Sequence, residues 1–326
     1  MEPTAEPARY PEKRLRAAAV RSRLMLQVAS VLVGDESWPD QQVRIEMRPP
    51  GGDKWRTALF ASDGIEGVAA VLNGHSQFAI LNPATAIRSA LLRLPGTRGD
   101  ELAAIATVPS YDQLGLAVPA ALGIHTLADL AAVKPALRVS LRGNRPTHSV
   151  HLVLDDVLAA GGITLDDIRA WGGEVSYDDG LPHKATRTGL LRDGAIDAIF
   201  DEGIYNWVEL ANDKGLRFLS LGADEASRLT ASGYRSATLR KDRYLSLEKD
   251  VSSVDFSGFL VFTRAEADDA MVGKFCEALV AARELTGWQG GPTLPLDQMC
   301  ADTVDAPVPI PFHPAAEATW RRHGLL

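Results

Sequence analysis

The chain has 326 residues, of which 46% are hydrophobic and 23% charged, so it is long enough for about two domains with apolar cores. Its formal net charge at pH 7 is −8, and apart from residues 13–16 it has no dense run of Lys and Arg, so we expect no nucleic-acid partner. Because no run of about 18 apolar residues occurs, we also expect no membrane insertion.

The N-terminal segment does not have the pattern of an export signal. Residues 1–7 carry acids before any base, and the segment 14–34 is interrupted by arginines. A signal peptide needs a basic start and an unbroken apolar run before its cleavage site. As the sequence stands we expect a cytoplasmic protein, and a periplasmic one if the true start lies elsewhere.

The rest of the chain alternates between short strands and helices. We expect residues 1–12 to form a disordered tail, and apolar residues at helical spacing predict a first helix over 14–33. Strands are predicted at 42–47, 55–60, 78–81, 105–108, 114–118, 174–177, 196–200, 217–221 and 256–262. Further helices are predicted at 65–72, 84–92, 127–133, 150–160, 186–192, 204–211, 267–285 and 315–322. Such alternation predicts an α/β fold with largely parallel sheets.

One pattern occurs twice. Residues 72–81 and 191–200 both run from a helix end through a glycine into a buried strand, which a polar residue and a new helix follow. The two copies suggest two similar lobes around a cleft.

The segment 137–149 is the most informative in the chain. A short strand breaks into a loop with Gly and Pro, and the loop opens a helix at Thr147 and Ser149. The backbone N–H groups and the positive dipole end of a helix N-terminus favour anions. With Arg142, Arg145 and His148 nearby, this loop is a candidate site for a carboxylate or phosphate.

Other chemistry is poorly supported by the sequence. We expect Cys276 and Cys300 to be buried, unpaired thiols, because neither has a Cys or His at metal-ligand spacing. The spacing of His148, His151 and Asp155 would suit a shared metal, but no second ligand pair accompanies it, so we expect no metal. There is no Gly-rich dinucleotide motif, P-loop or G-x-S-x-G elbow, and we expect no cofactor.

Several stretches between about residues 55 and 326 together carry a family resemblance: 63–74 (DGIEGVAAVLNG), 78–85 (FAILNPAT), 116–130 (LAVPAALGIHTLADL), 139–149 (VSLRGNRPTHS), 191–200 (LRDGAIDAIF), 244–254 and 312–324 (FHPAAEATWRRHG). In this order they resemble the TAXI-type solute-binding proteins of TRAP transporters, which have the two-lobed periplasmic-binding-protein type II fold. The family's characteristic Gly-rich first loop and its export signal have no counterpart here.

The resemblance implies a domain plan and a site. Lobe 1 would comprise 13–114 with 255–326, and lobe 2 would comprise 115–254, with hinges near 111–116 and 253–258. A small polar ligand, expected to be a carboxylate, would bind in the cleft by hinge closure. A membrane permease or another partner protein would receive the closed form. The ligand-binding candidates are Ser62, Asp63, Asn82, Arg145, Thr147, His148, Ser149 and Asp201.

Two other functions stay open. A cytoplasmic decarboxylase or lyase on the same fold would use His148, His183 and Glu202 as catalytic groups, because His and carboxylates can exchange protons near neutral pH. A cytoplasmic ligand sensor would present its closed form to a partner. Helix capping is the simpler reason for Ser, Asp and Asn at these positions.

Overall fold

The computed structural model describes residues 17–33, 42–48, 56–62, 64–143 and 147–326. The predicted tail 1–12 and the candidates Asp63 and Arg145 lie outside these residues. The chain divides into two compact units, Met1–Val43 and Arg44–Leu326. In the first unit, the helix predicted over 14–33 is present as α1 (Ala17–Val33).

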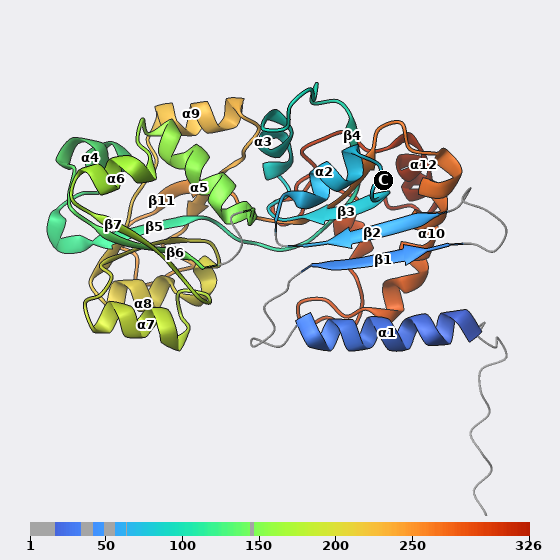
Figure 1. The fold of residues 1–326 in the computed structure, drawn as a ribbon, viewed down its shortest axis with the longest axis horizontal. Coiled ribbons are helices and arrows are strands. Elements are labelled where there is room, and N and C mark those ends of the chain that lie inside the picture. Colours follow the sequence, from blue (N-terminus) through green and yellow to red (C-terminus); the bar gives the residue numbers. More distant parts are fainter. Residues whose placement is uncertain (1–16, 34–41, 49–55, 63, 144–146) are drawn as a thin grey trace, which may run out of the picture. The chain divides into compact units, whose positions relative to one another are not determined.

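The first sheet has five strands in the order β1-β2-β3-β12-β4, of which β1 to β4 are labelled in Figure 1. β2 and β3 are parallel, whereas β12 is antiparallel to both of its neighbours. Its strands are β1 (Val43–Met47), β2 (Thr57–Ala61), β3 (Phe78–Leu81), β4 (Leu102–Val108) and β12 (Phe259–Arg264). The helices of these chain segments are α2 (Glu66–Leu72), α3 (Ala86–Leu92), α10 (Asp269–Ala282), α11 (Leu296–Met299) and α12 (Pro314–Arg322).

The second sheet has five strands in the order β7-β6-β8-β5-β9, and a separate hairpin, β10-β11, accompanies it. β6 is parallel to β7 and β8, and β5 is antiparallel to β8 and β9. The strands are β5 (Gly115–Pro119), β6 (Arg138–Arg142), β7 (Glu174–Asp178), β8 (Ala198–Asp201), β9 (Leu216–Phe218), β10 (Ser236–Leu239) and β11 (Val251–Val254). The helices are α4 (Leu127–Val133), α5 (Ser149–Ala160), α6 (Leu165–Ala170), α7 (Ala185–Arg192), α8 (Val208–Asp213) and α9 (Ala223–Ala231).

Two chain segments cross between the sheets, one after β4 and one before β12. They lie side by side: the Phe256 amide donates to the Asp112 carbonyl at 2.9 Å, and Gln113 and Asp255 form an antiparallel bridge. The two-lobed α/β fold class predicted from the sequence is therefore confirmed. We call residues 109–114 and 255–258 the crossing segments.

The prediction of largely parallel sheets was wrong. Both sheets are mixed, because β5 and β12 each enter directly from a crossing segment and run antiparallel to their neighbours. A strand that arrives this way does not need the right-handed helical crossover that imposes parallel pairing. The lobe boundaries 13–114 with 255–326 and 115–254 stay a prediction.

Apolar side chains fill three clusters. The largest runs from Val68 on α2 and Ile87 on α3 to Leu152 and Val153 on α5, so the helices of both lobes share buried surface. A second cluster surrounds Trp207. The third contains Trp320 together with Cys276 and Cys300, which are both buried and free, as predicted. No helix among the described residues has the length and apolar character needed to cross a bilayer.

Candidate functional site

Two loops, one from each lobe, meet at the candidate site. Gly64, in the β2–α2 connection, forms an antiparallel bridge with His148, just before α5. The Ile65 amide donates to the Thr147 carbonyl at 3.0 Å, and the Thr147 hydroxyl donates to the Glu66 carboxylate. The structure therefore brings Thr147 and His148 to the β2–α2 loop. We call these contacts the loop junction.

The N-terminus of α5 forms one side of the junction. The His148 ring caps this helix of 12 residues, because its Nδ1 accepts from the Val150 amide at 3.0 Å. Ser149, the first helical residue, is buried. The sequence placed a helix start here correctly, and the positive end of the helix dipole lies at the junction.

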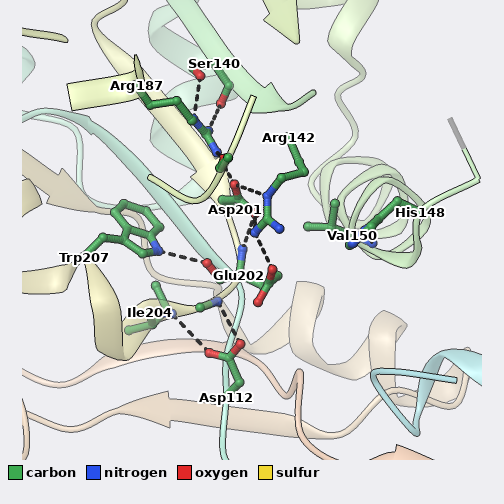
Figure 2. A network of polar contacts seen from close by, with 12 residues as sticks. Asp112, Ser140, Arg142, His148, Val150, Arg187, Asp201, Glu202, Ile204 and Trp207 are labelled. Carbon is green, nitrogen blue, oxygen red and sulfur yellow. Dashed lines mark hydrogen bonds and ion pairs between the residues drawn. The ribbon is translucent and has the colours of Figure 1, made fainter. Parts of the chain in front are cut away.

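A buried ionic network lies at the carboxyl ends of β6 and β8 (Figure 2). The Asp201 side chain has no exposed surface. Arg142 donates two hydrogen bonds to its carboxylate, from Nη2 to Oδ1 at 2.8 Å and from Nε to Oδ2 at 3.1 Å. Arg187, also fully buried, donates to the same carboxylate and to the Ser140 carbonyl. Nη2 of Arg142 also donates to Glu202. The four charged groups together carry no net charge.

The two arginines of this network differ in the direction of their pKa shift. Burial lowers the pKa of Arg142, but Asp201 and Glu202 more than compensate and hold that pKa above its ordinary value. For Arg187, burial outweighs Asp201 and lowers the pKa. Among the described residues, Nη1 of Arg142 has no hydrogen-bond partner, and the side chain is 13% exposed. Arg142 therefore has one donor group left for a ligand oxygen.

Asp112 ties the first crossing segment to the network. Its carboxyl group accepts from the backbone amides of Gly203 at 2.7 Å and Ile204 at 3.1 Å (Figure 2). It also accepts from the Gln113 amide at 2.8 Å. Complete burial and the neighbouring carboxyl of Glu202 raise the pKa of Asp112 well above its ordinary value, against the backbone donors that lower it. Burial and Glu202 thus act in favour of the neutral form of Asp112, whereas the backbone amides act in favour of the ionised form.

The first-lobe candidates have structural partners. The Asn82 amide donates to the carbonyls of Gly258 at 2.9 Å and Phe256 at 3.3 Å, so this side chain holds the second crossing segment. Ser62 does not cap α2 as the sequence suggested. Its hydroxyl accepts from the Gly64 amide at 3.1 Å, and Ile65 takes the N-cap position without a side-chain cap.

The catalytic arrangement expected for an enzyme rests on two histidines and an acid. His148 uses Nδ1 for the α5 cap, and Glu202 contacts Arg142, while His183 is half-buried before α7. In the part of the chain that the structure describes, no group of three or more His, Cys, Asp or Glu side chains could hold a metal ion. The roles of all sequence-predicted site residues stay predictions.

Three important side chains were missed by the sequence analysis: Glu66, Asp112 and Arg187. Glu66 was detectable as an acid in the first turn of a helix. Arg187 resembles an exposed helical residue in the sequence, and only the fold buries it beside Asp201. Asp112 lies between strands, where no periodic pattern marks burial.

Comparisons with known proteins give structural neighbours only. No protein-family model matches the chain, and no curated protein matches it significantly. It is similar to the alkanesulfonate-binding protein SsuA from Xanthomonas axonopodis pv. citri bound to MOPS, with 19% identity, 68% of this chain and 60% of that chain covered, and a TM-score of 0.33. It thus spans about three fifths of SsuA.

Two further structures align over more of their length. A Xanthomonas citri protein bound to chloride ion has 12% identity, with 80% of each chain covered and a TM-score of 0.40. The ATP phosphoribosyl transferase (HisG:HisZ) complex from Thermotoga maritima has 12% identity, with 78% of this chain and 92% of that chain covered and a TM-score of 0.35.

Proposed function

We propose that the protein binds a small organic carboxylate between its lobes and closes on it by a hinge motion. The observation that carries this proposal is that Nη1 of the Arg142 guanidinium has no hydrogen-bond partner among the described residues. This guanidinium is fixed by a two-point contact with the buried Asp201, it retains Nη1 as a donor among the described residues, and it lies at the end of β6, the last strand before α5 in the chain.

The charges near Arg142 suit a ligand with one negative charge. Asp201 and Glu202 are acidic, but both already contact arginine, so the network is neutral before the ligand arrives. A carboxylate that accepts from Nη1 gains a charge-assisted hydrogen bond.

The motion that we propose separates the two sides of the loop junction. Opening breaks the contacts of Thr147 with Ile65 and Glu66, which join the lobes through two short loops. The crossing segments pair with each other through backbone hydrogen bonds and can act as the hinge. A carboxylate that contacts both sides would favour the closed form, because it binds that form more tightly.

A thermal-shift screen against small aliphatic and aromatic carboxylates tests the proposal, with NMR of each hit to establish whether the ligand stays intact. A stabilising ligand recovered unchanged supports binding, and the stabilisation should grow with ligand concentration above Kd. Arg142→Gln should abolish the shift. The matched control is Arg138→Gln, on the same strand, because Arg138 is the more exposed arginine and pairs with Asp197 instead of the buried Asp201.

Other outcomes of the screen decide against the proposal. A hit that is chemically consumed would favour the decarboxylase or lyase alternative, and a screen without a carboxylate hit would contradict carboxylate binding.

The TAXI-type relationship, a permease or other protein partner, and a cytoplasmic or periplasmic location are further proposals. Co-purification of a membrane protein with the tagged, ligand-bound chain would support a transport role, and ligand-dependent capture of a soluble partner a sensing role.

A further inference from the structure

A cavity of about 650 Å³ lies against the crossing segments. Its lining comes from three parts of the chain: the crossing segments themselves, the β10 strand with the residues that follow it, and the loop at 304–305. Cavities of this volume accommodate small organic ligands. None of the ligand-binding or catalytic candidates from the sequence lines it.

Gln113 is the unusual residue of this cavity. It has no exposed surface, and neither the oxygen nor the nitrogen of its side-chain amide has a hydrogen-bond partner in the part of the chain that the structure describes. A buried amide without partners costs about 1–3 kcal/mol in mutational data. Most buried polar groups in native structures have at least one hydrogen-bond partner, so this amide needs an explanation.

The cavity and the Asp201 network both contact the first crossing segment. Tyr111 and Gln113 line the cavity, whereas the Asp112 carboxyl group between them accepts from the Gly203 and Ile204 amides in the network. A ligand in the cavity would therefore touch the hinge.

The charged residues that line the cavity indicate which charges a ligand should carry. Two of its arginines already have carboxylate partners: Arg235 pairs with Asp255 at 3.0 Å, and Arg240 pairs with Asp242. Among the described residues, one cation and one anion of the lining form no ion pair. They are Arg243, whose guanidinium stacks over the Tyr111 ring at 4.0 Å, and Asp305.

We propose that this cavity is a second ligand site, for an α-amino acid in its zwitterionic form. The ligand carboxylate contacts Arg243, and its ammonium group contacts Asp305. A ligand with only a negative charge would be repelled by Asp305, and a ligand with only a positive charge would be repelled by Arg243. A zwitterion avoids both repulsions. Because Asp305 precedes α12 and Arg243 follows β10, such a ligand bridges the lobes across the hinge and would act as an effector of closure.

The test uses the side-chain amide signal of Gln113 in two-dimensional ¹⁵N NMR of the full chain, assigned by its loss in Gln113→Leu. Each standard L-amino acid is titrated at millimolar concentration, with its N-acetyl and decarboxylated analogues. We expect at least one amino acid to shift the signal, and both analogues to bind at least about tenfold more weakly. Arg243→Gln and Asp305→Asn should weaken binding similarly, whereas Arg283→Gln, on an exposed lobe 1 arginine, should not.

The proposal is overturned if no amino acid moves the Gln113 signal, or if Arg243→Gln leaves the affinity unchanged. Either failure is distinguishable from a failure of the carboxylate site. Binding in this cavity should be insensitive to Arg142→Gln, and carboxylate binding at the loop junction should be insensitive to Arg243→Gln.

Discussion

Asp112 offers the sharpest test of how the hinge is held, because its side chain joins the first crossing segment to the loop after β8. Three backbone amides donate to its buried carboxyl group. We compare Asp112→Ala, which removes every acceptor, with Asp112→Asn, which keeps the shape and one acceptor oxygen but cannot ionise.

The expected losses follow from the hydrogen bonds. Each buried donor left unsatisfied costs about 1–3 kcal/mol. Asp112→Ala leaves three such donors, and partial access of water to them reduces the total, so we expect a loss of about 3–5 kcal/mol in the free energy of unfolding. Asp112→Asn leaves one oxygen in place and orphans the donor that faces its amide nitrogen, so we expect about 1–3 kcal/mol.

The pH dependence carries more information than the size of the loss. Burial and Glu202 raise the pKa of Asp112 in the folded state, while in the unfolded chain it is about 3.9. For an acid whose folded pKa is raised, the contribution to stability is complete below the unfolded pKa and is lost as pH rises through the folded pKa. Between the two pKa values the wild type should lose about 1.4 kcal/mol per pH unit relative to Asp112→Asn.

Urea denaturation followed by circular dichroism, at a series of pH values from about 5 to 8, measures this difference. We expect the destabilisation caused by Asp112→Asn to shrink as the pH rises. If the wild type and Asp112→Asn keep a constant difference over this range, Asp112 is ionised in the folded protein and the reasoning is refuted. Equal losses in Asp112→Asn and Asp112→Ala would show that its hydrogen bonds do not hold the hinge.

Three further predictions concern buried groups. Arg187→Met should destabilise the fold by about 3–5 kcal/mol in urea denaturation, because it leaves Asp201 buried with only Arg142, and a loss under about 1 kcal/mol would contradict the network. Gln113→Leu should raise the free energy of unfolding by about 1 kcal/mol, since it removes two unsatisfied polar atoms, and a loss would mean that the amide is satisfied in solution. Cys276 and Cys300 should react with a thiol reagent at pH 8 only after unfolding, because burial raises each thiol pKa to about 12, and rapid native-state reaction would refute their burial.

Local pattern was sufficient to predict much of the fold. The strand and helix around 137–160 were predicted because an apolar run ends in a Gly and Pro loop and continues at helical spacing, and β6 and α5 occupy these positions. Boundaries were less accurate where tertiary contacts set them. The helix predicted from residue 84 begins at Ala86, since Asn82 and Pro83 first pass the second crossing segment.

The site was harder to predict because its contacts join distant parts of the chain. Arg142 could be selected from its loop, but its partner Asp201 is 59 residues away. Asp201 was selected as a strand-end acid for a ligand, whereas the structure shows its carboxylate contacting two arginines. Arg187 could not be recognised, because nothing in the pattern of α7 distinguishes a buried arginine from an exposed one.

The central claim is that the lobes close on a carboxylate, and single-molecule energy transfer between the lobes tests it most directly. Dyes on Leu245→Cys and Leu285→Cys suit the measurement, because these side chains are 82% and 76% exposed while the native cysteines are buried. We predict that the carboxylate found by screening converts a broad distance distribution into a single narrow one, and that Arg142→Gln prevents this. An unchanged distribution at saturating ligand would contradict hinge closure.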